Sequence, residues 1–208
     1  MRFLVTAGPT REPIDPVRYL SNRSSGRMGY AIAAALREAG NEVVLVSGPV
    51  ALSAPAGVER HVVETALEML ASCQRHWPTC DGVFAVAAVA DYRPIRYCDR
   101  KLKRRAGEGR ILELAPNPDI LATLAAEKSG RLAVGFALES EDGEMEARRK
   151  LEQKNLDFIC LNGPEAQAAE TSSLLLISRD GTRLALGPLP KEELARVLVR
   201  NVLSAHQG

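Results

Sequence analysis

The sequence predicts an α/β fold: a three-layer, Rossmann-like arrangement of helices around a mainly parallel central sheet, with a C-terminal β-hairpin at one edge. Two observations predict it. Short apolar segments alternate with segments of helical periodicity, an order typical of parallel sheets that are covered on both faces. Near the end of the chain, Ser173–Arg179 and Thr182–Leu186 flank the dipeptide Asp180-Gly181, which is a strong hairpin signal.

Four strands are expected in the first half of the chain, each a short apolar segment bounded by turn residues. They are Phe3–Thr6, Glu42–Ser47, Glu59–Val63 and Gly82–Ala88. A helix should follow the first strand, because one apolar face recurs with helical period before the stop signal Gly40-Asn41. That face comprises Met28, Ile32, Ala35, Leu36 and Ala39. Thr65 and Glu68 form a capping box for a second helix that reaches about His76.

In the second half, Asn117-Pro118-Asp119 opens a helix, and Pro118 suits its first turn. Further strands are expected at Leu132–Phe136 and Phe158–Leu161, and further helices at Glu141–Lys154 and Lys191–Ala205. The chain has no internal repeat, low-complexity tract or clear linker, so residues 1–208 are predicted to form a single domain.

Composition excludes several classes of function. The chain has 208 residues, 46% of them hydrophobic, and a formal net charge of +1. A nearly neutral protein has no global field that would attract it to nucleic acid or to an anionic membrane, so we expect neither partner. The N-terminus does not resemble a signal peptide, and no run approaches about 20 apolar residues, so no membrane helix is expected.

The cysteines, Cys73, Cys80, Cys98 and Cys160, lack the spacing of a zinc knuckle or a redox dithiol. His76 lies between Cys73 and Cys80, so a metal site there is conceivable, but buried thiols and a surface histidine are the favoured interpretation. A reduced, cytoplasmic protein fits this cysteine usage best.

The strongest functional signal is the long segment between the first strand and the first helix. It spans about twenty residues, where connections in compact α/β units usually take about 2–6. It ends in hydroxyl and small residues at a helix start, where free N–H groups and the helix dipole favour a phosphate. The expected phosphate-binding residues are Ser24, Ser25, Gly26 and Gly29. Simple N-capping by Ser24 or Ser25 is the alternative.

Three further signals follow later strands. Small residues at Ala85–Ala88 would let a flat group approach the backbone closely. Asp91 could then hold a ribose hydroxyl or Mg²⁺, and a role as an ordinary turn residue is equally plausible. The basic, aperiodic segment Asp91–Arg105 is interpreted as a flap that closes over a polyphosphate. Lys150 and Lys154 share a helical face, so their like charges repel each other. A bound anion would offset this repulsion for both lysines, or Glu146 could offset the charge of Lys150 alone.

These blocks, in order, carry a resemblance to a known family. They read TAGPTREPIDPVRYLSNRSSGRMGYAIA, SGPV, AVADYRP, KLKR, NPDIL, VGFALE and KLEQKNLDFI. Together they resemble phosphopantothenoylcysteine synthetase, also called phosphopantothenate–cysteine ligase, across nearly the whole chain. The resemblance implies condensation of 4'-phosphopantothenate with L-cysteine in coenzyme A biosynthesis. It also implies CTP as co-substrate, Mg²⁺, an acyl-cytidylate intermediate and a homodimer.

The resemblance also implies roles for particular residues. Asn22 and Arg18 would face the acyl intermediate, with Asn22 donating a hydrogen bond to its carbonyl oxygen, and Lys101 would assist activation. The implied nucleotide-binding residues are Ala85, Val86, Ala87, Asp91, Lys101, Pro118, Asp119, Ile120, Leu121, Phe136, Lys150 and Lys154. No metal ligand can be assigned from the sequence.

Some features depart from the family pattern. Pro116 stands where a basic residue often precedes NPDI, and GFALES replaces the commoner GFAAET. Many bacterial members carry a decarboxylase module in front, so a separate phosphopantothenoylcysteine decarboxylase, or a longer chain, is expected. The alternatives are an NAD(P)-dependent Rossmann oxidoreductase, which the missing GxGxxG disfavours, and a non-catalytic nucleotide-binding module.

Overall fold

A computed structural model describes residues 1–104, 107, 109–138, 143–162 and 171–207. The α-helices are α1 (Arg27–Glu38), α2 (Ala66–His76), α3 (Ile120–Ala126), α4 (Gly143–Gln153) and α5 (Lys191–Gln207). The strands of the main sheet are β1 (Arg2–Ala7), β4 (Glu42–Ser47), β5 (Glu59–Val62), β6 (Gly82–Ala85), β9 (Leu132–Leu138), β10 (Phe158–Asn162), β11 (Thr171–Ser178) and β12 (Arg183–Pro190). Two short hairpins comprise β2 (Arg11–Pro13) with β3 (Tyr19–Ser21), and β7 (Tyr92–Pro94) with β8 (Leu114–Pro116).

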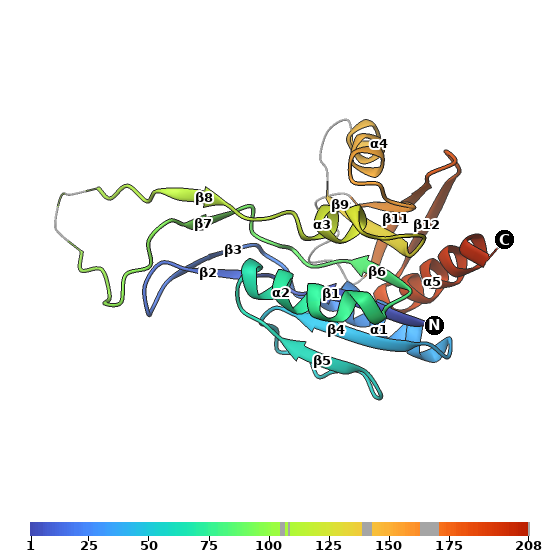
Figure 1. The fold of residues 1–208 in the computed structure, drawn as a ribbon, viewed down its shortest axis with the longest axis horizontal. Coiled ribbons are helices and arrows are strands. Elements are labelled where there is room, and N and C mark those ends of the chain that lie inside the picture. The colour runs from blue at the N-terminus through green and yellow to red at the C-terminus, as the bar shows by residue number, and fades with distance from the viewer. Residues whose placement is uncertain (105–106, 108, 139–142, 163–170, 208) are drawn as a thin grey trace.

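The main sheet has 8 strands in the order β12-β11-β10-β9-β6-β1-β4-β5. All neighbours from β10 to β5 are parallel, and β11 and β12 add an antiparallel hairpin at one edge (Figure 1). This confirms the predicted fold class and the edge hairpin. The turn is at Asp180-Gly181, where Gly181 has a φ of 89° and the Asp180 carboxylate accepts a hydrogen bond from the Thr182 N–H.

Both faces of the sheet are buried, which explains the continuous apolar strands. In β1, Phe3 and Val5 pack into one core cluster with residues of α1 and α5, while Leu4 packs into the other. The second cluster takes residues from α2, α3 and α4, such as Met69 and Leu124. The three layers are therefore α1 and α5, the sheet, and α2 with α3 and α4.

Most expected boundaries are close to those observed, and the capping box of Thr65 and Glu68 is present at the start of α2. Strand β6 ends at Ala85, earlier than expected, and the chain then makes only an isolated bridge between Ala88 and Pro9. The expectation that Pro118 occupies the first turn of α3 is wrong. Asp119 is the N-cap, because its carboxylate accepts a hydrogen bond from the Ala122 N–H at 2.9 Å, so Pro118 precedes the helix. Of the expected helix Glu141–Lys154, Glu141 lies outside the described residues, and α4 ends at Gln153.

The two short hairpins form an arm that the sequence did not predict. The β7–β8 hairpin projects far from the main sheet, and the β2–β3 hairpin runs beside it (Figure 1). The long segment before α1 therefore contains two paired strands, and the basic segment after Asp91 begins as strand β7. Arg105 lies outside the described residues. Among the described residues, no helix is long and apolar enough to cross a membrane.

Candidate active site

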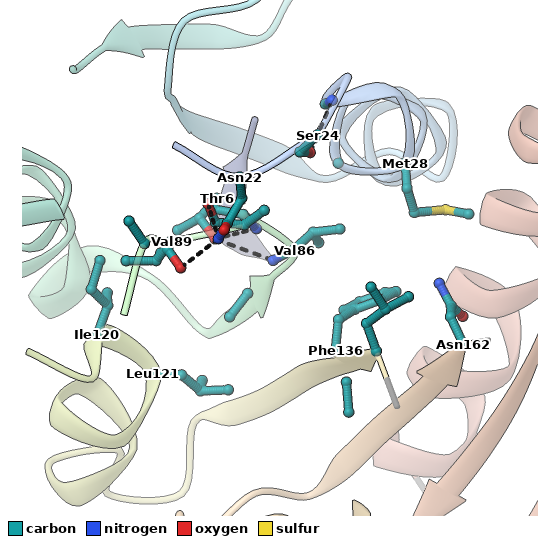
Figure 2. Close-up of a pocket in the computed structure, with 18 of the residues that line it drawn as sticks. Thr6, Asn22, Ser24, Met28, Val86, Val89, Ile120, Leu121, Phe136 and Asn162 are labelled. Carbon is teal, nitrogen blue, oxygen red and sulfur yellow. Dashed lines mark hydrogen bonds between the residues drawn. The ribbon is translucent and has the colours of Figure 1, made fainter. Parts of the chain in front are cut away.

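A pocket of about 840 Å³ opens where β1, β6, β9 and β10 end beside the start of α1. In parallel α/β sheets the loops after the strands gather at this edge, which is where ligands usually bind. Figure 2 shows Met28 of α1 across the pocket from Phe136 and Asn162, which come from β9 and β10. The pocket is lined by most of the residues singled out from the sequence. These are Asn22, Ser24, Ser25, Gly26, Gly29, Ala85, Val86, Ala87, Asp91, Pro118, Asp119, Ile120, Leu121, Phe136, Lys150 and Lys154.

The start of α1 has the features of an anion site. Its N-cap is Gly26, with a φ of 75° and no side-chain hydrogen bond to the first turn. The Ser24 hydroxyl instead accepts a hydrogen bond from the Gly26 N–H at 3.3 Å. The alternative that Ser24 or Ser25 caps the helix is therefore wrong. The first N–H groups of α1 therefore remain available at the pocket, where the positive end of the helix dipole favours a phosphate.

Two glycines allow α1 to approach the sheet closely. A Cβ on Gly29 would lie 2.5 Å from the Ala7 Cβ, so only glycine lets the first turn of α1 pack directly on the end of β1. A Cβ on Gly26 would lie 2.9 Å from a Val50 methyl group, in addition to the cost of its positive φ. The helix start is therefore held at the floor of the pocket rather than displaced outward.

The segment after β6 is held by two threonines that the sequence analysis missed, Thr6 in the pocket wall and the buried Thr10. The Thr6 hydroxyl accepts hydrogen bonds from the Val86 and Ala87 N–H groups at 3.1 and 3.2 Å, as Figure 2 shows. The buried Thr10 hydroxyl accepts one from the Ala90 N–H at 3.0 Å. These bonds hold the small-residue segment open along the pocket, although no pattern in the sequence links positions so far apart.

Asn22 holds the same segment from the pocket side. Its amide group donates hydrogen bonds to the carbonyl oxygens of Ala88 and Val89, at 3.3 and 2.9 Å (Figure 2). Nearby, the Asn117 amide donates to the Ala90 carbonyl oxygen at 2.8 Å, and the Asn117 N–H donates to the Asp91 carbonyl oxygen. The backbone around Asp91 is thus tied down, and its exposed carboxylate stands at the pocket rim.

The two lysines of the charged helix both line the pocket, but they differ in their contacts. Lys154 forms an ion pair with Asp119 at 2.7 Å. Glu146 forms two hydrogen bonds of 3.0 and 2.7 Å with Arg149, and the nearby charge of Lys150 also contributes to lowering the pKa of Glu146, as the alternative interpretation of this face expected. Both lysines therefore interact with acidic residues of the chain while they line the pocket.

The far end of the pocket contains residues that the sequence analysis also missed. Lys191, at the start of α5, is only 6% exposed, and burial together with the nearby charge of Arg27 lowers its pKa. Asn162 has a buried side-chain oxygen with no hydrogen-bond donor among the described residues. A positive charge in the first turn of a helix interacts unfavourably with the helix dipole. This unusual position was the one feature of the sequence that could have pointed to a functional role for Lys191.

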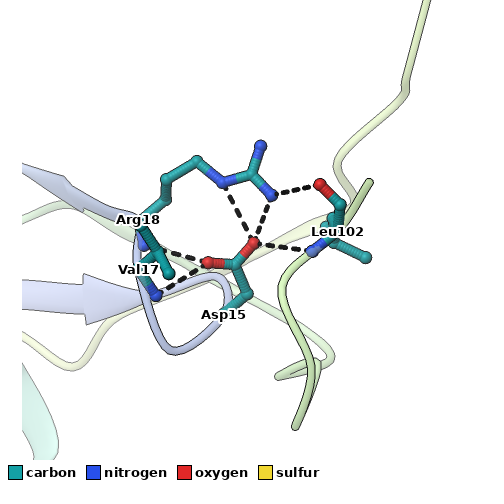
Figure 3. Close-up of polar contacts among 4 residues, drawn as sticks. All are labelled: Asp15, Val17, Arg18 and Leu102. Atoms are coloured by element: carbon teal, nitrogen blue, oxygen red, sulfur yellow. Dashed lines mark hydrogen bonds and ion pairs between the residues drawn. The ribbon is translucent and has the colours of Figure 1, made fainter. Parts of the chain in front are cut away.

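Arg18 and Lys101 do not line the pocket; they lie on the arm. Figure 3 shows the fully buried Asp15 carboxylate accepting hydrogen bonds from the Arg18 side chain and from the N–H groups of Val17, Arg18 and Leu102. Arg18 also donates to the Leu102 carbonyl oxygen at 2.9 Å. The ion pair lowers the pKa of Asp15 well below its usual range. This network joins the β2–β3 hairpin to the basic segment, directly beside Lys101.

The expected buried thiols are present: Cys73, Cys80 and Cys160 are buried, and none of the cysteines forms a disulfide. Burial raises the pKa of Cys73 to about 12 and also raises that of Cys80. These thiols are thus poor metal ligands, because a metal binds the thiolate.

Fold and pocket together define a Rossmann-like α/β domain with a pocket at the start of α1. The chain belongs to the family described as the DNA/pantothenate metabolism flavoprotein C-terminal domain, which it matches over residues 1–205. This confirms the family resemblance found in the sequence.

Named relatives agree with this assignment. The chain is 44% identical over 201 residues to the coenzyme A biosynthesis bifunctional protein CoaBC of Escherichia coli strain K12, covering 93% of this chain and 49% of the relative. It is 48% identical over 163 residues to the CoaBC of Vibrio cholerae, covering 77% of this chain and 41% of that protein. A crystal structure of the C-terminal domain of CoaBC superposes with a TM-score of 0.85 at 40% identity, covering 100% of this chain and 96% of that one. The chain thus spans about half the length of the curated relatives it matches.

Proposed function

We propose that this chain is a phosphopantothenate–cysteine ligase that uses CTP to join 4'-phosphopantothenate to L-cysteine in coenzyme A biosynthesis. The carboxylate oxygen attacks the α-phosphorus of CTP, which forms an acyl-cytidylate and releases pyrophosphate. The cysteine amine then attacks the acyl carbon, an amide bond forms, CMP leaves, and the amine proton passes to solvent. The observation that carries the proposal is the pocket that combines the uncapped start of α1 with Lys150 and Lys154. The similarity to CoaBC, which covers 93% of this chain, supports it.

The pocket suits a nucleotide in three respects. The α1 start and the lysines provide charge for phosphates. The backbone after β6 and the ring of Phe136 suit a flat base. Asn162 lines the pocket, and a rotation of its side chain would let its oxygen, which is now buried without a partner among the described residues, accept a hydrogen bond from an exocyclic amine, a group that cytosine and adenine share. The choice of CTP over ATP therefore rests on the family resemblance, and a nicotinamide cofactor is disfavoured by the absence of GxGxxG.

Mg²⁺ would be held by few protein groups. Mg²⁺ sites at nucleotides commonly use one or two carboxylates together with phosphate oxygens and water. The exposed carboxylate of Asp91 at the pocket rim fits this mode. When bound, Mg²⁺ would offset the negative charge of the phosphates.

The functional test is to incubate the protein with phosphopantothenate, cysteine and Mg²⁺ and to measure pyrophosphate with each nucleoside triphosphate. We expect release with CTP and much weaker release with ATP. Equal or better turnover with ATP would overturn the choice of nucleotide, and release with neither would overturn the ligase. NADH or NADPH binding without pyrophosphate release would support an oxidoreductase instead.

We also propose a homodimer formed through the arm. Large apolar side chains are exposed along it: Val17, Tyr19, Tyr92, Ile95, Tyr97, Ile111 and Leu114. Ile111 is 92% exposed, whereas in the terminal hairpin, which could also supply an interface, Leu184 is only 37% exposed. Exposed apolar side chains that gather on one part of a protein commonly mark an interaction surface. Ile111→Ser should shift the protein toward monomer in sedimentation, and an unchanged sedimentation profile would count against this interface.

A dimer would explain why Arg18 and Lys101 lie away from the pocket of their own chain, because the arm of one chain could then complete the pocket of its partner. Mixing inactive Lys101→Gln with inactive Asn22→Asp tests this arrangement. If the site is shared, mixed dimers have one intact site, and random reassortment should restore about a quarter of the wild-type activity. No recovery after verified subunit exchange would show that each site belongs to one chain.

The product of this reaction keeps the cysteine carboxylate, so a decarboxylase is the proposed next enzyme, either as a separate chain or as part of a longer one. A cytoplasmic location is proposed from the cysteines, which form no disulfide.

A further inference from the structure

Two histidines and a glutamate meet outside the pocket, between the edge strand β5 and the end of α2. Each of Glu59, His61 and His76 offers a ligand-type atom, and these atoms all lie within 4.8 Å of one another. The His61 and His76 rings are 4.3 Å apart between centroids. The Glu59 carboxylate is 2.8 Å from His61 Nε2. None of the three residues lines the pocket described above.

The backbone of β5 directs the two ligands of this strand to the same side. Glu59 and His61 are two residues apart, so they project from one face of the strand. Arg60, between them, projects from the other face and donates a hydrogen bond to the Tyr30 hydroxyl of α1. Glu59 and His61 therefore face the end of α2, where His76 is the last residue.

Arg2 orients the carboxylate. Its guanidinium binds one oxygen of Glu59 at 3.1 Å, while the other oxygen faces His61. Carboxylate ligands of metals are commonly held by such a second hydrogen bond. The charge of Arg2 also weakens cation binding, so the expected affinity is below that of a four-ligand structural site.

His76 lacks a partner for one of its ring nitrogens. Its Nε2 atom is buried and has no hydrogen-bond partner among the described residues. A cation bound by one nitrogen of each ring and by the Glu59 carboxylate would give all three side chains a common partner.

We propose that Glu59, His61 and His76 form a binding site for a divalent transition-metal cation of the Zn²⁺ type. Two imidazoles and one carboxylate are a common zinc ligand set, which leaves a position for water. Tetrahedral ligands around zinc lie about 3.3 Å apart, so small rotations of these partly exposed side chains complete the site. A bound ion would join the edge strand β5 to α2.

The test is calorimetric titration of Zn²⁺ into the chelator-treated protein. The wild-type protein should bind one equivalent. His61→Ala removes a ligand and should weaken binding by at least about tenfold, which is the smaller end of the loss typical even for an outer-shell partner. His206→Ala is the matched control, because the chain has 3 histidines and His206 lies on α5 outside the cluster. Cys98→Ser controls for the one cysteine that is not buried. Both control variants should bind as the wild type does.

Two further measurements report on the site itself. Co²⁺ should give visible absorption bands in the wild type that His61→Ala and Glu59→Gln lose. Zn²⁺ at about a hundredfold excess over its dissociation constant should raise the melting temperature by about 5–10 °C in the wild type and not in His61→Ala. The proposal is overturned if the wild type binds no Zn²⁺, or if His61→Ala binds it as well as the wild type. Because His61 is partly exposed, its replacement should leave the fold intact.

Discussion

Replacing Asn22 by aspartate tests the assignment of this residue to the chemistry. The Asn22 amide donates two hydrogen bonds to backbone carbonyl oxygens, and a carboxylate cannot donate either. Since Asn22 is exposed, the new carboxylate can turn toward water. The cost to stability is then the loss of two ordinary hydrogen bonds, about 1–3 kcal/mol. For a chain of this size the melting temperature should fall by about 2–12 °C.

The expected loss of activity is larger than this loss of stability. The 3.3 Å bond from the Asn22 amide to the Ala88 oxygen is longer than the 2.9 Å bond to Val89, so it is the one that an acyl oxygen can displace. Negative charge grows on that oxygen as the amine attacks, and loss of one donor to it typically costs about 10²–10³ in rate. Asn22→Asp should therefore remain folded, bind CTP and lose at least about a hundredfold in product formation.

Thr10→Val is the matched control, because it removes a hydrogen bond to the same segment without lining the pocket. It leaves the Ala90 N–H without its partner, at a cost of about 1–3 kcal/mol, and should keep most of its turnover. Product formation by mass spectrometry and thermal melts with and without CTP separate the cases. If Asn22→Asp turns over normally, or if Thr10→Val loses as much activity, Asn22 has no direct part in the chemistry. Loss of CTP binding in Asn22→Asp would assign the residue to shaping the loop.

Three other outcomes are expected. Gly29→Ala should destabilise the protein by about 1–3 kcal/mol in chemical denaturation despite a better helix propensity, because its Cβ meets Ala7 at 2.5 Å; unchanged stability would contradict the proposed close contact. The folded-state pKa of Asp15 is depressed, so its stabilising contribution is present above the usual value of 3.8 and is lost as pH falls below it. The stability difference between wild type and Asp15→Asn should accordingly shrink below that pH, and a constant difference would argue against the Asp15–Arg18 pair. Trypsin should cut the arm after Lys101 or Lys103, and saturating CTP with Mg²⁺ should slow this cleavage if the arm completes a nucleotide site. Equal cleavage rates with and without CTP would argue against this role of the arm.

The sequence predicted the main sheet well because its central strands, such as β1 and β4, are continuous apolar segments that are buried on both faces of the sheet. It missed the arm because β2, β3, β7 and β8 are three residues long and carry no hydrophobic period. Such strands form only when a partner strand from another part of the chain pairs with them. The basic segment was therefore interpreted as an irregular flap, although pairing of β7 with β8 directs it outward.

Within the pocket, too, the sequence predicts residues whose position follows from the local chain and misses those that only distant contacts bring together. Residues that follow a strand or open a helix, such as Asp91 and Gly26, were found because their place in the chain predicts their place in space. Thr6 and Asn162 resemble ordinary strand residues, and their contribution depends on which strands become neighbours. Lys191 begins a helix that is distant in sequence from the other pocket residues, so only the fold could bring it to the site.

The nearly neutral net charge conceals positive groups that are already partly balanced within the chain. Lys154 is paired with Asp119 in the pocket, and Arg18 with the buried Asp15 on the arm. The proposed triphosphate would be able to displace Asp119 from Lys154, because both side chains are partly accessible to water. The Asp15 contact is different, because its carboxylate is fully buried and also accepts three backbone N–H groups. Asp15 therefore fixes the position of Arg18, whereas the proposed triphosphate would compete with Asp119 for Lys154.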